Sequence, residues 1–292
     1  MIETNRRSVA PCLTLTDVWV AFTTAEAPHT ALRNVTLAVN DGEWLAIVGP
    51  NGGGKSTLAR VMAGLCPVSR GNIASDVPVA FVWQNPDAQI VGDTVREDIQ
   101  FGLEATGEAD SDMDSIVRDV LAQVGLNVAP DTPADALSGG QQQLLATASS
   151  LALQPALIVF DEATSMLDPA ARARVLETAK RLHTGGTTIV WVTQWLEELA
   201  YADRVIALAD GAIAYAGDPR AFLYGDDPPA TNATNATDVT NASVTDCMSP
   251  CERLGFEAPF TVRLTRELLR LGSSFSPLPM NPEQWARCLE SR

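Results

Sequence analysis

The chain is poor in basic residues. It has 20 Lys+Arg against 36 Asp+Glu, a formal net charge of −16, and its only lysines are Lys55 and Lys180. Nucleic acid and anionic lipid carry charge of the same sign, so an extended electrostatic contact with either is disfavoured. We therefore expect neither a nucleic-acid-binding protein nor one that coats a membrane surface.

Long hydrophobic runs are also missing. No stretch approaches the ~18 apolar residues of a membrane-spanning helix, and the opening MIETNRRSV has two arginines with no apolar segment after them. We expect neither a span nor a secretion signal. The five cysteines are scattered, and Cys247 and Cys251 lack a second pair to complete a zinc site. Unpaired thiols in a reducing compartment are expected.

What the chain does have is an alternation of strand-like and helix-like segments. Strands are expected within 12–48, and at 78–84, 156–160, 187–193 and 204–209; helices are expected at 55–65, 110–125, 138–154, 169–183 and 195–201. Such alternation predicts a parallel sheet in an α/β fold. Asp210-Gly211 between two apolar runs predicts a tight hairpin.

The composition changes near the end of the chain. Residues 226–246 are repetitive and have few large apolar side chains, which predicts a flexible linker. Residues 247–292 resume a folded pattern and are expected to form a small C-terminal α-helical appendage. The main domain would then span 12–225.

A glycine-rich loop lies between a buried strand and a helix. It fits the phosphate-loop pattern G-x-x-x-x-G-K-[ST] and comprises Gly49, Pro50, Asn51, Gly52, Gly53, Gly54, Lys55 and Ser56. Backbone amides and the helix N-terminus would face phosphate oxygens. Lys55 would contact the β- and γ-phosphates, Ser56 would bind Mg²⁺, and Thr57 would lie near the α-phosphate.

Two carboxylates follow the apolar strand 157–160. Ligands of open parallel sheets bind at the carboxyl ends of strands, so Asp161 should emerge beside the phosphate loop. Asp161 would hold Mg²⁺, and Glu162 would orient or deprotonate an attacking water.

A second phosphate-binding arrangement precedes the helix at 138–154. Ser138, Gly139, Gly140 and Gln141 place open backbone amides at a helix N-terminus. Because one chain has little use for two such sites on one ATP, this segment would serve nucleotide held by another subunit.

These motifs, with Gln84 after a strand and Ser165-Met166-Leu167-Asp168, occur in the order found in ATP-binding-cassette ATPases, which the chain resembles over 12–225. The resemblance implies a P-loop NTPase fold with a RecA-like parallel core, an antiparallel β subdomain and a helical signature subdomain at about 86–150. It also implies head-to-tail pairing with a second ATPase subunit.

The same resemblance assigns further site residues. Phe22 matches the aromatic that stacks on adenine, Gln84 the glutamine that senses Mg²⁺ and couples to a membrane partner, and Asp168 the aspartate that crosses the dimer interface.

The stretch Gln84-Asn85-Pro86-Asp87, the following TVREDIQFGLE and the ending RLGFEAPFTVRLTRELLRLG are similar to the first ATPase of energy-coupling-factor importers of vitamins and metals. This narrower resemblance implies ATP hydrolysis at the cytoplasmic face of the membrane. The partners would be a second ATPase, a transmembrane T subunit and a substrate-binding S subunit.

The chain departs from the family pattern at two positions. Gln194 stands where a histidine usually contacts the γ-phosphate, and Leu144 where arginine is common. An amide can donate a hydrogen bond but cannot become a cation, so we expect a slow site in a heterodimer. The alternatives are a soluble cassette ATPase of DNA repair or translation, and a regulatory subunit that binds ATP with little turnover.

Overall fold

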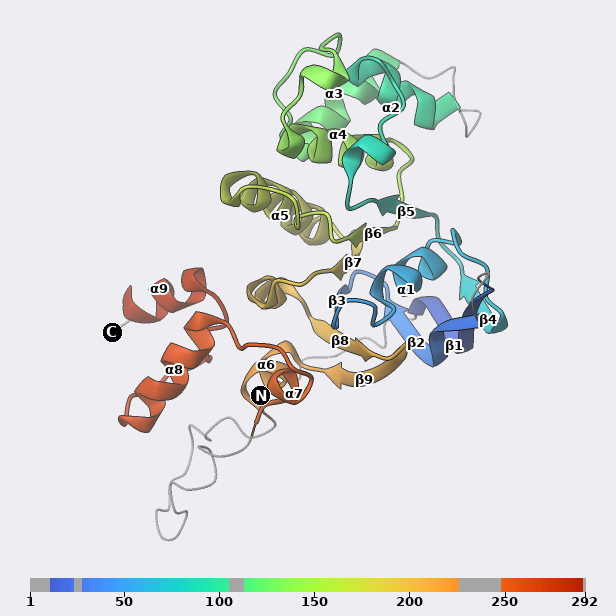
Figure 1. Cartoon of the computed structure of the whole chain (residues 1–292). Helices are drawn as coiled ribbons and strands as arrows, with labels where there is room; N and C mark the ends of the chain where they lie inside the picture. The colour runs from blue at the N-terminus through green and yellow to red at the C-terminus, as the bar shows by residue number, and fades with distance from the viewer. Residues whose placement is uncertain (1–10, 24–27, 105–112, 226–247, 291–292) are drawn as a thin grey trace, which may run out of the picture.

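The computed structural model describes residues 11–23, 28–104, 113–225 and 248–290. Its centre is a six-stranded sheet in the order β5-β6-β7-β3-β8-β9 (Figure 1). The strands of this sheet are β3 (Trp44–Val48), β5 (Val79–Val82), β6 (Leu157–Asp161), β7 (Thr188–Val192), β8 (Arg204–Ala209) and β9 (Ala212–Gly217).

Strands β5, β6, β7, β3 and β8 pair in parallel, which confirms the predicted α/β sheet. Every residue of β3, β6 and β7 is buried, as expected of apolar runs covered on both faces. Only β9 runs antiparallel, and it joins β8 through the predicted turn at Asp210-Gly211.

One face of the sheet packs against a second, antiparallel sheet and a helix. The second sheet has the order β2-β1-β4, with β1 (Pro11–Thr23), β2 (Pro28–Asn40) and β4 (Arg70–Ser75). Apolar side chains of β1 and β2 share a buried cluster with helix α1 (Lys55–Met62) and with Ile47 of the central sheet. This core packs α1 against the central sheet.

The opposite face carries most of the helices. They are α2 (Val95–Glu104), α3 (Met113–Val124), α4 (Gly139–Ala152) and α5 (Pro169–Thr184), with short 3₁₀ segments η1 (Pro86–Ala88) and η2 (Ala134–Ala136). A continuous cluster of their apolar side chains reaches Phe160 and Trp191 of the sheet. Figure 1 shows α2, α3 and α4 as a group beyond the β5 edge, with α5 between that group and the strands.

Some elements differ from the sequence expectations. The segment expected as a helix at 195–201 is a 3₁₀ helix, η3 (Leu196–Tyr201), and α1 stops at Met62 rather than at residue 65. No helix of the described ranges is both long and apolar enough to cross a bilayer.

The C-terminal helices pack on the β8 side of the sheet. They are α7 (Pro250–Arg253), α8 (Phe260–Arg270) and α9 (Pro282–Glu290), beside α6 (Pro219–Tyr224). Cys251, Val262 and Met280 share a buried cluster with Val48 of the central sheet. The predicted linker at 226–246 lies outside the described residues.

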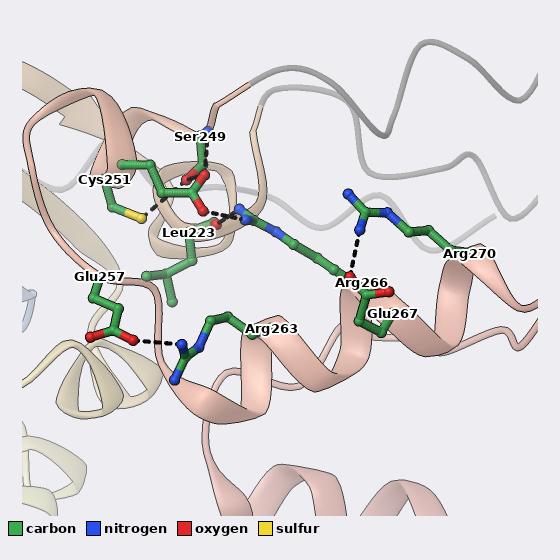
Figure 2. A network of polar contacts seen from close by, with 9 residues as sticks. Leu223, Ser249, Cys251, Glu257, Arg263, Arg266, Glu267 and Arg270 are labelled. Atoms are coloured by element: carbon green, nitrogen blue, oxygen red, sulfur yellow. Dashed lines mark hydrogen bonds and ion pairs between the residues drawn. The ribbon is translucent and has the colours of Figure 1, made fainter.

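Arg266 ties this C-terminal group to the rest of the chain (Figure 2). Its guanidinium contacts Glu252 at 2.7 Å and also donates to the carbonyl of Leu223 on α6. A partly buried arginine thus bridges two helices that lie on either side of 226–247 in the chain.

Candidate functional site

The phosphate loop leaves β3 and turns directly into α1. Lys55, 5% exposed, points its Nζ at the carbonyl oxygens of Gly49 and Pro50, 3.0 and 3.2 Å away. Gly53 N–H donates to the Pro50 carbonyl at 3.0 Å, which closes the loop on itself. Asn51 and Gly52 lie at its exposed tip.

Two glycines of the loop are required by close backbone approach. A Cβ on Gly49 would lie 2.4 Å from the Leu208 carbonyl oxygen of β8, and one on Gly54 would lie 2.7 Å from the Ala31 carbonyl oxygen of β2. Gly54 also has φ +100, which favours glycine. The close packing of β8 and β2 against the loop therefore leaves no room for a side chain at Gly49 or Gly54.

Ser56 and Asp161 meet as expected from the strand order. Ser56 Oγ donates to Asp161 Oδ1 at 2.8 Å, and Asp161 is buried at the end of β6. Burial raises the pKa of the Asp161 carboxyl, while the Ser56 hydroxyl and Arg60 oppose that rise. A hydroxyl and a carboxylate side by side are the hard oxygen donors that Mg²⁺ prefers, so the residues fit the ion.

Glu162 is the meeting point of the site. Its carboxylate accepts from Gln194 Nε2 at 2.7 Å, lies 3.5 Å from Gln84 Nε2, and lies 3.5 Å from Lys55 Nζ. Its backbone has φ 50, and its N–H donates to the Val192 carbonyl of β7. A non-glycine residue in this region is uncommon and here aims the carboxylate toward the phosphate loop.

Gln84, which follows β5, is linked to the loop after β6. Its Nε2 donates to Ser165 Oγ at 3.0 Å as well as approaching Glu162. Gln84 and Gln194, from two different loops, therefore both donate to the Glu162 carboxylate. All three loops lie at the sheet edge where Lys55 is found.

The Ser138–Gln141 segment lies elsewhere. Ser138 caps α4, and its side chain forms a reciprocal capping box with Gln141. A Cβ on Gly140 would lie 2.5 Å from the Ala171 Cβ of α5, so this glycine is needed for helix packing, whereas Gly139 faces open space. Among the described residues, no hydrogen bond or ion pair joins this segment to the phosphate loop.

Asp168 and Phe22 are also not among the described residues that contact Glu162. Asp168 is the N-cap of α5 and accepts from Ala170 and Ala171 N–H, both at 2.9 Å. These bonds, that from Ala171 first, hold the pKa of Asp168 below its usual value. Phe22 is 44% exposed near the end of β1, and Thr57 is half-buried in the first turn of α1.

The sequence reasoning missed a buried carboxylate behind the site. Glu198 of η3 is 1% exposed and contacts Thr164 and Arg172, which flank Asp168 in the chain. The only signal in the sequence is an acidic pair, Glu197-Glu198, within an otherwise apolar segment. Ser165 was likewise noticed only as part of a motif.

Comparison with known proteins gives the family. The model of the family described as "ABC transporter" matches residues 32–165. The energy-coupling factor transporter ATP-binding protein EcfA1 of Geobacillus kaustophilus is 38% identical over 87% of this chain and 88% of its own length. EcfA1 of Halalkalibacterium halodurans is 40% identical over 67% of this chain and 76% of its own length.

Solved structures agree with this assignment. CbiO1 from Clostridium perfringens, described as part of the ABC transporter complex CbiONQ, has a TM-score of 0.64 at 26% identity, covering 72% of this chain and 89% of its own. The ATP-binding cassette MJ0796, solved as a dimer with ADP and phosphate, has a TM-score of 0.64 at 26% identity, covering 71% and 99%. The chain belongs to the ATP-binding proteins of energy-coupling factor transporters, within the ABC family, and is an ATP-hydrolysing energy-coupling subunit of a transporter.

Proposed function

We propose that the chain works as one half of a head-to-tail ATPase dimer, in which ATP lies between its phosphate loop and the Ser138–Gln141 segment of the other subunit. The support is the separation of two helix N-termini, those of α1 and α4, each suited to phosphate. A single ATP bound at Lys55 would leave the second N-terminus unused unless it served a partner. Asp168, exposed at the start of α5 in the same region as Gly140, would face that partner.

Within its own site, the chain would bind the phosphates of ATP through the amides of residues 49–57 and through Lys55. Ser56 and Asp161, with Gln84, would hold Mg²⁺. The ion, when bound, neutralises charge on the β- and γ-phosphates. Phe22 would stack on the adenine.

Glu162 is proposed as the general base that accepts the proton of the attacking water. The observation that carries this role is the convergence of Gln194, Gln84 and Lys55 on its carboxylate at 2.7, 3.5 and 3.5 Å. These contacts hold the carboxylate at the phosphate loop, where a general base must lie within reach of the attacking water.

The test is Glu162→Gln, measured in the assembled dimer with the second site silenced. Positioned acid–base groups contribute roughly 10²–10⁴-fold, so we expect hydrolysis to fall by that factor while ATP binding is retained. Hydrolysis within about threefold of the native rate would show that Glu162 is not the base.

Gln194 is proposed to make this site slower than its counterpart in the dimer. Its amide holds Glu162 at 2.7 Å but carries no positive charge. A subunit that binds ATP with little turnover is the second candidate, and the same substitution of histidine by glutamine favours it.

We further propose that the chain lies at the cytoplasmic face of a membrane, joined to a T subunit and an S subunit that selects a vitamin or a metal. The names of its relatives support an energy-coupling factor transporter, and CbiO1 belongs to a multi-subunit complex. The docking region would include exposed Val91 and Phe101, beside the acidic Asp93 and Glu97. Reversing those two charges should weaken co-purification with the T subunit; unchanged assembly would contradict this docking region.

A further inference from the structure

A saturated carboxylate lies directly behind the loop that carries Gln194. Glu198 is 1% exposed, and each of its oxygens accepts two hydrogen bonds. Oε1 accepts from Thr164 Oγ1 at 3.0 Å and from Arg172 Nε at 2.7 Å. Oε2 accepts from Trp191 Nε1 at 2.8 Å and from Thr193 Oγ1 at 2.5 Å.

The donors come from the segment that runs from the end of β6 into α5 and from the segment at the end of β7. Thr164 follows Glu162 after β6, and Arg172 lies in the first turn of α5, just after Asp168. Trp191 belongs to β7 and Thr193 follows that strand immediately before Gln194. One buried charge therefore joins the loop proposed to face the other subunit to the loop that carries Gln194.

Both neighbours of Gln194 are held by this network. Thr193 donates to Glu198, and the Thr193 hydroxyl in turn accepts from the Trp195 backbone N–H at 3.0 Å. The Arg172 guanidinium lies over the Trp195 ring, 4.2 Å from its centroid. The backbone on each side of Gln194 is therefore held in place through Thr193 and Trp195, while the Gln194 amide contacts Glu162.

A fully paired buried carboxylate is a rigid connector because moving any one donor would leave a charge unsatisfied in a dry environment. Among the described residues, the hydrogen bonds and ion pairs of Glu198 include none with Glu162, Lys55 or Ser56. Any influence it has on the reaction must therefore pass through the groups that it holds.

We propose that Glu198 is a positioning residue, which sets the Gln194 amide against Glu162 according to the position of Arg172 and the first turn of α5. Through it, the docking of another subunit near Asp168 is transmitted to the catalytic carboxylate. The inference rests on the proposed role of Glu162 as the general base, whose carboxylate the Gln194 amide contacts at 2.7 Å.

The experiment measures kcat and KM for ATP in the full-length assembled dimer, with the other subunit's catalytic carboxylate neutralised. The variants are Glu198→Gln, Gln194→Ala and the double variant. Glu197→Gln, on the adjacent half-buried glutamate, is the matched control for loss of one charge on η3.

We expect Glu198→Gln to lower kcat at least tenfold with KM changed by less than twofold, and Glu197→Gln to lie within twofold of native. In the Gln194→Ala background, Glu198→Gln should cost less than threefold, because its effect passes through the missing amide. Two independent losses that multiply would overturn the inference, as would equal effects of the two glutamate variants.

The two proposals fail in different ways. If Gln194→Ala lowers kcat while Glu198→Gln leaves it unchanged, the inference fails and the proposed role of Glu162 as the base stands. If Gln194→Ala leaves kcat unchanged, positioning through the amide fails, whereas a Glu162→Gln rate within about threefold of native would remove the proposed base itself.

Arg172→Met is a second variant, for the case in which Glu198→Gln does not fold. The Arg172 side chain is 20% exposed, and without it Glu198 keeps its hydrogen bonds from Thr164, Trp191 and Thr193; a thermal melt checks that the variant is folded. We expect a five- to tenfold lower kcat at unchanged KM, and an unchanged kcat would overturn the inference.

Discussion

Replacing Gln194 by histidine tests the idea that this site is slow by construction. The native amide donates from Nε2 to Glu162 Oε2 at 2.7 Å, which positions the carboxylate but brings no positive charge to the phosphoryl group. An imidazole at this position can carry positive charge toward the phosphoryl group, where negative charge develops during transfer.

The size of the effect follows from that hydrogen bond. Hydrogen bonds to charged groups contribute ~1.5–3 kcal/mol, and each ~1.4 kcal/mol of barrier is tenfold in rate. If the imidazolium adds one such interaction to the phosphoryl group in the transition state, Gln194→His should raise kcat about 10- to 150-fold.

The assay is steady-state phosphate release by the reconstituted transporter, with the other ATPase site silenced. Gln194→Asn is the control, because it keeps the amide on a shorter side chain and should not accelerate the reaction. An unchanged or lower rate with Gln194→His would refute the reasoning and leave the glutamine as a functional equivalent of histidine.

Three further outcomes follow from packing and burial. Asp161→Asn should raise the melting temperature of nucleotide-free protein at pH 7. The folded pKa of this carboxyl is raised by burial, so ionisation costs stability as pH rises above it; the gain should shrink as the pH falls toward ~4, and melts across pH check this. Gly140→Ala should lower the free energy of unfolding, measured in denaturant, by ~1–3 kcal/mol, because the added Cβ would lie 2.5 Å from the Ala171 Cβ. Gly139→Ala, which faces open space, should not have this effect. Equal effects of the two variants would contradict the packing argument. Arg266→Ala should lower the free energy of unfolding by ~1–3 kcal/mol and speed limited proteolysis of the C-terminal helices, because it removes charged hydrogen bonds to Glu252 and Leu223. Arg263→Ala, on the exposed face of α8, should leave cleavage unchanged. Similar cleavage of both variants would contradict the bridging role.

The parts of the site that the sequence could predict are those encoded within a few residues. The glycine spacing ahead of Lys55 and the acids that end β6 are local patterns, and the parallel sheet brings them together at one edge. The structure places Ser56 against Asp161 as that topology requires.

Other features depend on neighbours far along the chain. Glu198 is buried because Arg172 and Trp191 supply its donors, and no periodicity near η3 shows this. Gly140 suits the phosphate-binding reading of its motif, yet its contact with α5 is visible only in three dimensions. The C-terminal helices could be expected as helices, but not their docking on α6.

The phosphate loop also has a long-range dependence. Gly211, at the turn between β8 and β9, donates its N–H to the Gly53 carbonyl at 3.2 Å and accepts from Arg33 N–H at 2.8 Å. A nascent chain emerging from the ribosome therefore cannot form these two hydrogen bonds until residue 211 has left the ribosome, long after the phosphate loop has been synthesised. Competence to bind nucleotide should appear late in translation, as a property of the closed sheet rather than of the glycine-rich segment alone.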